Sequence, residues 1–241
     1  GGIAGVNFGN ISNCKNKGSI DAGYATGGIV GAQYGSGKIS NCVNEGEFIE
    51  NFGTYTKGGI LGTNSKNGIV EYCYNLSDID FKSDSGHGGI VGTNYNNGII
   101  QYCFNKGNLN QGGYVIGGIA GGNVATIQYC YNTGNISLTN PGSYAYGIGS
   151  GGTIKNCYNI GEIMALNSIF YQIGGPDATI QNSYWLGTNL DDATCKEAEF
   201  MKTQTFVDLL NSEDDKIFSM DATEINSGYP ILSWQKEKNG K

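Results

Sequence analysis

Residues 88–110 read GGIVGTNYNNGIIQYCFNKGNLN, and variants of this unit recur about six times along the 241-residue chain. The unit has three phrases: one opens with Gly-Gly-Ile at Gly88, the second ends in Cys-x-Asn at Cys103 and Asn105, and the third is a short Gly-x-Leu phrase ending at Leu109. Successive copies of the cysteine lie 27 to 31 residues apart. A fixed period of this size is the signature of a solenoid or a propeller.

Each phrase is short, rich in Ile, Val and Tyr, and bounded by Gly, Asn or Ser, so it predicts a strand and not a helix. Three short strands per period fit one coil of a β-helix better than a propeller blade, which needs four strands in about 40–45 residues. We therefore expect an all-β, parallel β-helix of about six to seven coils with three short strands per coil. The general preference of parallel crossovers makes a right-handed solenoid the expectation.

The Cys-x-Asn pair predicts an internal ladder, because residues two apart in a strand point to the same face. Stacked asparagine amides can donate to one another from coil to coil, which satisfies buried polar groups. A disulfide between neighbouring cysteines is the alternative, but side chains stacked in register point the same way and oppose its geometry, so free buried thiols are expected. The predicted ladder comprises Cys14, Cys42, Cys73, Cys103, Cys130 and Cys157, with Asn16, Asn44, Asn75, Asn105, Asn132 and Asn159.

The Gly-Gly-Ile/Leu-x-Gly phrase, followed by Ile-x-Asn-Cys-Tyr-Asn and Gly-x-Ile, resembles the GLUG motif over about residues 1–187. The resemblance implies a β-solenoid segment of a bacterial cell-surface or secreted protein, with adhesion or surface display as the expected role. The GLUG family has no catalytic motif, so the resemblance assigns no active-site residue. The MKTQ, LLN and GYPILSWQ stretches within residues 201–235 resemble the segment that often closes such arrays.

Residues 188–241 lose the glycine punctuation and predict a C-terminal capping segment, with an amphipathic helix at about 196–210 followed by short strands. We expect this segment to cover the apolar end of the last coil. Cys195 lies outside the ladder and is the expected accessible thiol. The chain starts inside a repeat at Gly1, so a preceding coil or cap is expected as well.

The composition excludes some partners. The net charge is −7 and all 14 basic residues are lysines, which argues against nucleic acid because phosphate binding needs a basic stripe. No run of 18 apolar residues occurs, so membrane insertion is not expected. Glycine (41 residues) is abundant at a fixed period and proline (3 residues) is scarce, which indicates ordered turns and not disorder.

Aromatic side chains flank the ladder cysteines and should point outward, since the cysteines point inward. Such a strip could stack on the apolar faces of sugar rings, so host or bacterial glycans, or surface proteins, are the expected partners. The competing interpretation is that stacked rings only stabilise the sheet. The candidate binding residues are Tyr72, Tyr74, Tyr102, Phe104, Tyr129, Tyr131 and Tyr158.

Metal and triad chemistry are poorly supported. The single histidine, His87, falls in what the sequence suggests is a variable loop, a poor setting for a catalytic triad. The acidic residues Asp78, Asp80 and Asp84 lack the spacing of a calcium loop and predict a solvated loop. The cysteines form no Cys-x-x-Cys pair, so neither a metal nor a cofactor is expected.

β-Helices also host glycan-cleaving enzymes, which use clustered carboxylates. Here Glu45, Glu47, Glu71 and Glu162 are scattered over different phrases, so a non-catalytic protein is expected. The sequence thus predicts a structural or adhesion module. A carbohydrate-binding module is the alternative and a glycan-cleaving enzyme a remote one.

Overall fold

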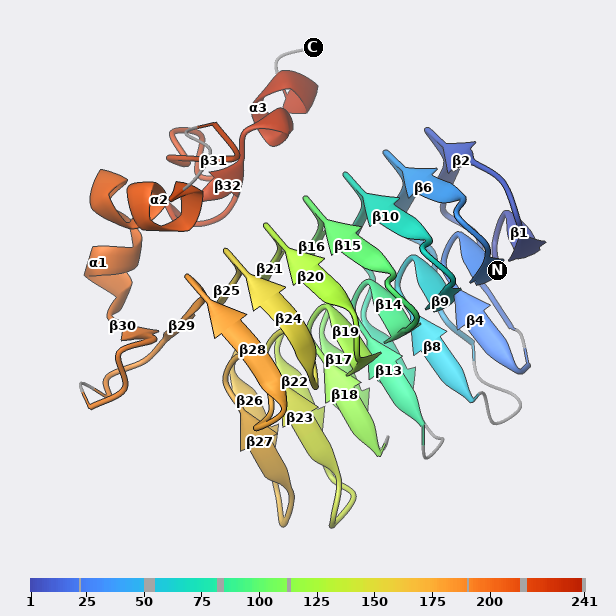
Figure 1. The fold of residues 1–241 in the computed structure, drawn as a ribbon, viewed down its shortest axis with the longest axis horizontal. Coiled ribbons are helices and arrows are strands. Elements are labelled where there is room, and N and C mark those ends of the chain that lie inside the picture. The colour runs from blue at the N-terminus through green and yellow to red at the C-terminus, as the bar shows by residue number, and fades with distance from the viewer. Residues whose placement is uncertain are drawn as a thin grey trace.

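The chain folds into a parallel β-solenoid of about six turns, whose coils lie side by side from the N-terminus onward (Figure 1). A segment with short helices lies alongside this solenoid at the C-terminal end of the chain (Figure 1). No helix in the described part of the chain is long and apolar enough to cross a membrane. The computed structural model describes residues 1–21, 23–49, 55–81, 85–111, 114–189, 191–212 and 216–239.

One full coil contains five short strands, where the sequence predicted three. The residues that lead into the Gly-Gly pair form a strand of their own, which ends at Gly88, and the second phrase bends at Tyr102 and so contributes two strands. In the coil quoted above the strands are β13 (Gly86–Gly88), β14 (Val91–Asn94), β15 (Ile99–Gln101), β16 (Phe104–Asn105) and β17 (Leu109–Gln111).

The second phrase bends because the residue directly before each ladder cysteine has a left-handed backbone conformation. Tyr102 has φ 55°, and the corresponding residue has φ between 43° and 56° in the other coils: Asn13, Asn41, Tyr72, Tyr129, Asn156 and Asn182. A left-handed non-glycine residue costs about 1–2 kcal/mol, least for asparagine, whose short side chain tolerates this region. This conformational requirement explains why four of the seven residues at this corner are asparagines.

The strands stack into five parallel sheets, numbered here in the order in which a coil visits them. Sheet 1 contains β4 (Ala25–Gly27), β8 (Thr56–Gly58), β13, β18 (Val115–Gly117), β23 (Tyr144–Tyr146) and β27 (Ile169–Tyr171). Sheet 2 contains β1 (Ala4–Asn7), β5 (Val30–Tyr34), β9 (Leu61–Ser65), β14 and β19 (Ala120–Asn123). Sheet 5 contains β12 (Ile79–Phe81), β17, β22 (Ile136–Leu138) and β26 (Ile163–Ala165).

Sheets 3 and 4 are formed by the two halves of the second phrase. Sheet 3 contains β2 (Ile11–Ser12), β6 (Lys38–Ser40), β10 (Ile69–Glu71), β15, β20 (Thr126–Gln128), β24 (Gly152–Lys155) and β28 (Ala178–Gln181). Sheet 4 contains β3 (Lys15–Asn16), β7 (Val43–Asn44), β11 (Tyr74–Asn75), β16, β21 (Tyr131–Asn132), β25 (Tyr158–Asn159), β29 (Tyr184–Leu186) and β30 (Cys195–Lys196).

The central core lies inside the coils and is made of columns of one residue type each. The isoleucine after Gly-Gly supplies one column, the aliphatic residue in the middle of each sheet 3 strand a second, and the ladder cysteine a third. A second apolar cluster fills the space between sheets 1 and 5 and includes Leu109, Ile116 and Ile136. Each coil buries the same positions as its neighbours because the strands pair in register.

The asparagines of the Cys-x-Asn pairs form the predicted ladder. The Nδ2 of each residue donates to the Oδ1 of the next, at 2.8–2.9 Å, from Asn16 through to Asn159. The same Nδ2 of Asn105 also donates to the Gly107 carbonyl at 2.8 Å, so the side chain closes its own corner. The ladder explains the second glycine of each Gly-Gly pair. A Cβ on Gly89 would lie 2.4 Å from Cγ of Asn105 and 2.3 Å from the Gly118 carbonyl oxygen.

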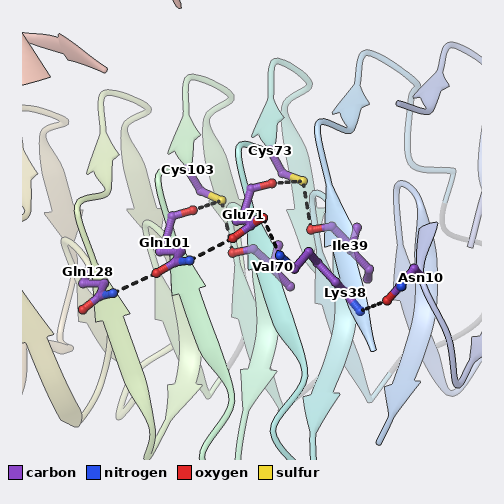
Figure 2. Close-up of polar contacts among 9 residues, drawn as sticks. All are labelled: Asn10, Lys38, Ile39, Val70, Glu71, Cys73, Gln101, Cys103 and Gln128. Carbon is purple, nitrogen blue, oxygen red and sulfur yellow. Dashed lines mark hydrogen bonds and ion pairs between the residues drawn. The ribbon is translucent and has the colours of Figure 1, made fainter. Parts of the chain in front are cut away.

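The ladder cysteines are free thiols, as expected, and five of the six are buried in the central core. Each inner thiol donates to carbonyl groups nearby: Sγ of Cys73 lies 3.1 Å from the Glu71 oxygen and 3.7 Å from the Ile39 oxygen (Figure 2). Burial raises the pKa of Cys73 and Cys103 well above the ordinary thiol value. These thiols are therefore packing groups and not nucleophiles.

A second polar ladder lies inside sheet 2, and the sequence analysis missed it. Asn64 donates to Asn94, and Asn94 to Asn123, each at 2.9 Å. The signal was present in the sequence as an asparagine four residues after the isoleucine of most Gly-Gly-Ile phrases. This ladder breaks at Gln33, where the Nε2 of Gln33 and the Oδ1 of Asn64 are both buried without a hydrogen-bond partner.

The C-terminal segment contains two short helices where one was expected. These are α1 (Ala198–Met201) and α2 (Gln204–Asn211), separated because Thr203 caps α2 by accepting from the Phe206 N–H at 3.3 Å. An antiparallel pair, β31 (Phe218–Ser219) and β32 (Ile231–Leu232), and the helix α3 (Trp234–Asn239) follow.

The sequence predicted that this segment covers the end of the last coil, and it covers only part of that end: β30 pairs in parallel with β29, the last coil's strand in sheet 4. The segment turns back and runs along the outside of sheet 4 toward the earlier coils (Figure 1). In the last coil Phe170 and Ile180 remain 47% and 37% exposed. Trp185 takes the place of the ladder asparagine and packs against the central core, which it partly closes. The outer face of sheet 4 offers the segment a row of aromatic rings, against which it buries its own apolar side chains.

The broken ladder in sheet 2 makes a prediction about stability. We expect Gln33→Asn to raise the free energy of unfolding by about 1–3 kcal/mol, because the shorter amide can donate to Asn64 and satisfy two buried groups at once. Chemical denaturation of the two proteins measures this difference.

Two variants calibrate that measurement. Asn105→Leu interrupts the intact ladder and should lower the free energy of unfolding by about 1–3 kcal/mol for each group left unsatisfied. Asn110→Ala removes an exposed amide that donates to Asp80 at 3.1 Å, and should change stability by less than about 0.5 kcal/mol. Equal stability of Gln33→Asn and the parent protein would contradict the ladder interpretation.

The cysteine column predicts the number of reactive thiols. Cys195, the expected accessible thiol, is only 9% exposed, whereas Cys14 in the first coil is half-buried. We expect about one of the seven thiols to react in the native protein, and all seven after unfolding. Burial and the neighbouring Cys42 thiol raise the pKa of Cys14, so its reaction should accelerate as the pH rises.

Cys14→Ser should abolish the native reaction, and the matched variant Cys195→Ser should leave it unchanged. A native reaction that survives Cys14→Ser would place the accessible thiol elsewhere.

Candidate functional site

Two columns of stacked rings cover the outer face of sheet 4. The corner residues Tyr72, Tyr102 and Tyr129 stack with ring centroids 4.9 and 5.6 Å apart. The residues after the cysteines form the second column, in which Tyr74, Phe104, Tyr131 and Tyr158 follow at 4.7, 5.0 and 5.0 Å. Strand register brings these side chains together and ring stacking stabilises each column.

The C-terminal segment packs its own apolar side chains onto these columns. Phe206 of α2 meets Tyr158 and Tyr184 edge-on, with centroids 6.1 and 5.5 Å apart. At the other end of the segment, Trp234 lies 6.0 Å from Tyr74 and 5.9 Å from Phe104. The rings and the segment together form a third apolar cluster, outside the coils.

Hydrogen bonds fix the segment in place. The Tyr131 hydroxyl donates to Oε1 of Gln235 at 3.0 Å, and the Tyr158 hydroxyl donates to the Pro230 carbonyl. Nδ2 of Asn156 donates to the Leu210 carbonyl at 2.6 Å. Burial raises the pKa of both tyrosines well above the ordinary value, so they remain neutral donors at any physiological pH.

The aromatic strip is therefore not the exposed surface that the sequence analysis expected. The rings of Phe104, Tyr129, Tyr131 and Tyr158 are buried beneath the C-terminal segment. Only Tyr72, Tyr74 and Tyr102 remain half-buried. The expectation was wrong for the four buried rings because alternation along a strand predicts which way a side chain points, but not what covers it.

A polar ladder follows the outer face of sheet 3. Nζ of Lys38 lies 2.9 Å from the Glu71 carboxylate, which accepts from Gln101 at 2.8 Å (Figure 2). Gln101 in turn accepts from Gln128 at 2.8 Å (Figure 2). Glu71 is buried in this row between a cation and an amide, so its carboxylate serves a structural purpose.

The carboxylates considered for glycan cleavage lie on different faces. Glu45 pairs with Lys15 at 2.5 Å, whereas Glu71 belongs to the ladder on sheet 3. Glu47 and Glu162 are exposed. Within the described ranges, no three His, Cys, Asp or Glu side chains are grouped as a metal site would require.

The acidic cluster takes part in register contacts between coils. Asp78 accepts from the Asn108 N–H at 2.7 Å, and Asp80 accepts from the Asn110 amide at 3.1 Å. Asp84 lies outside the described residues.

His87 is not in a loop, as the sequence analysis assumed. It is a fully buried residue of β13, in register with Lys57 of β8. Lys57 is itself only 2% exposed and donates to the Asp80 carbonyl at 2.9 Å. The sequence analysis missed Lys57, although its place directly before a Gly-Gly pair marks the same position as His87.

The chain is similar to one known family and to one solved structure. The family model of the GLUG motif matches residues 22–49, so the chain carries a GLUG motif and the resemblance in the sequence is confirmed. No curated protein matches the chain.

One solved structure is similar over nearly the whole chain. It is the crystal structure of a "putative immunoglobulin A1 protease" from Bacteroides ovatus, which is 20% identical, with a TM-score of 0.61. The similarity covers 95% of this chain and 70% of that one. At this identity the similarity concerns the fold.

The packing of the segment on sheet 4 predicts a large loss of stability for Phe206→Ala. Phe206 is fully buried against Tyr158 and Tyr184, so its truncation should cost about 3–5 kcal/mol. Thermal unfolding and limited proteolysis between residues 188 and 212 measure this effect.

Leu209→Ala is the matched control on the same helix, because Leu209 is 37% exposed and its truncation should cost much less. Equal effects of the two variants would contradict the packing of α2 on the aromatic columns.

Proposed function

We propose that this chain is a non-catalytic structural or adhesion module of a bacterial cell-surface or secreted protein. The observation that carries the proposal is the asparagine ladder, which runs in one direction through the core from Asn16 to Asn159. A stack whose coils each satisfy the next is a rigid spacer, suited to presenting a surface at a distance. The GLUG motif supports the same role.

The properties of the thiols are compatible with an extracellular location. An oxidising medium attacks thiolates, and the inner cysteines are buried with raised pKa values. Their thiols would persist there without forming disulfides, since stacked side chains in register oppose the geometry of that bond.

Two experiments test this proposal. Beads coated with the chain should be retained under flow on at least one surface bearing glycans or surface proteins, and beads coated with heat-unfolded chain should not. Incubation with polysaccharides and with immunoglobulin A1 should yield no new fragments in mass spectra. Turnover of either substrate class by the purified chain would contradict a non-catalytic role.

A carbohydrate-binding module is the second candidate. The buried rings of the aromatic strip are covered by the C-terminal segment and offer no surface to a sugar. What favours the candidate now is the half-buried pair Tyr74 and Trp234, whose centroids lie 6.0 Å apart at the end of the C-terminal segment. Aromatic faces left partly open in this way can take the apolar face of a sugar.

A further inference from the structure

A cavity of about 220 Å³ lies where the C-terminal segment ends on sheet 4. Ligand sites for whole drug-sized molecules begin at about 300 Å³, so this cavity has room for one ring and not for a chain. Its walls include Tyr74, Phe104 and Lys106 from the solenoid and Ile225, Trp234 and Gln235 from the C-terminal segment.

Aromatic rings form the apolar part of the cavity wall. Tyr74 and Phe104 are nearly parallel, at 10° and 4.7 Å, as part of the stacked column. Trp234 is tilted by 37° and 29° to these two rings and contacts both, with centroids 6.0 and 5.9 Å away. Tyr74 and Trp234 are half-buried and line the cavity, so each offers apolar ring surface to a ligand there.

Gln235 supplies a hydrogen-bond donor to this cavity. It is 5% exposed, and its Oε1 accepts from the Tyr131 hydroxyl at 3.0 Å and from the Leu232 N–H at 2.8 Å. These two bonds fix the orientation of the amide. Its Nε2 donates to no group in the described part of the chain, and Gln235 lines the cavity.

Lys106 is the only charged side chain among the described residues that line the cavity. Its Nζ donates to the Ile225 carbonyl at 2.5 Å, and an ammonium group has three protons to donate. The ion pairs Lys15–Glu45 and Lys38–Glu71 do not involve Lys106. Burial lowers the pKa of Lys106, so an anion in the cavity would stabilise its charged form.

Asp221 carries a negative charge that raises the pKa of Lys106, against the larger effect of burial, which lowers it. Its carboxylate already accepts from the N–H groups of Ile225, Asn226 and Gly228 at 3.1, 2.7 and 3.2 Å. Asp221 does not line the cavity, so the polar groups that face a ligand are donors.

We propose that this cavity binds a sugar residue that carries a carboxylate, such as a uronic or sialic acid at the end of a glycan. The apolar face of the sugar packs on Tyr74 and Trp234, the carboxylate accepts from Nζ of Lys106, and a hydroxyl oxygen accepts from Nε2 of Gln235. The inference rests on the second candidate function, carbohydrate binding, and adds the site and the class of sugar to it.

The test is a titration of the whole chain with the methyl glycosides of glucuronic acid, N-acetylneuraminic acid and glucose. Calorimetry and ligand-observed NMR measure the binding of each sugar. We expect an acidic sugar to bind about tenfold or more tightly than glucose, because a hydrogen bond between charged groups is worth more than a neutral one. This preference should shrink as salt is added, because Lys106 is partly exposed.

Three variants locate the site. Lys106→Gln keeps a donor for the Ile225 carbonyl but removes the charge, and should reduce acidic-sugar binding to the level of glucose. Trp234→Leu should weaken both kinds of sugar. Lys202→Gln is the matched control, because both lysines lie over an aromatic ring, Lys106 at 5.9 Å from the Phe104 centroid and Lys202 at 4.7 Å from the Tyr229 centroid, but Lys202 does not line the cavity. Thermal unfolding of each variant verifies that it is folded.

The outcomes distinguish failure of this inference from failure of carbohydrate binding as a whole. Equal binding of acidic and neutral sugars, or acidic-sugar binding that survives Lys106→Gln, would overturn this inference and leave carbohydrate binding intact. No binding of any sugar would overturn both. Loss of the acidic preference in Lys106→Gln but not in Lys202→Gln supports the site as described.

Discussion

The constraint on which the fold depends is the satisfaction of asparagine amides buried inside the coils. A buried amide without a partner costs about 1–3 kcal/mol, and the chain places one in the core of almost every coil. Only stacking at strand spacing and in strict register lets the Nδ2 of Asn75 reach the Oδ1 of Asn105, and so on along the row. The ladder therefore excludes slipped registers, and the same close approach admits only glycine at positions such as Gly89.

Sheet 4 separates two different environments. Its inner side holds thiols and amides, and its outer side holds stacked rings that need a cover. The C-terminal segment supplies that cover, so it belongs to the fold as much as the coils do. In the first two coils the outer ring position holds Lys15 and Val43, and the aromatic column begins at Tyr74. Trp234 packs against Tyr74 there, and the cavity that we propose as the sugar site lies at that boundary.

Much of the solenoid could be predicted from its period and spacing, because each repeated residue reports on one position in every coil. The Cys-x-Asn ladder followed from two-residue alternation, and the structure contains it. The division into five strands did not follow, because the left-handed turn at Tyr102 breaks a phrase that is continuous in sequence. The sequence did not predict that His87 and Lys57 are buried, because the residues before each Gly-Gly pair vary from coil to coil and show no strand pattern. The pairing of β8 with β13 shows that both residues occupy the same strand position.

By itself, the sequence determined that the chain is a parallel β-solenoid, that the Cys-x-Asn pairs face the core, and that the cysteines are unpaired. These properties repeat with every coil, so a local pattern suffices to read them. Only the tertiary structure decided what lies over the outer rings, that Cys195 is buried while Cys14 is half-open, and that Lys106 and Gln235 face one cavity. The cover over the rings and the cavity depend on contacts between residues 104–158 and residues 198–235. Contacts between segments so far apart in the chain leave no periodic pattern in the sequence.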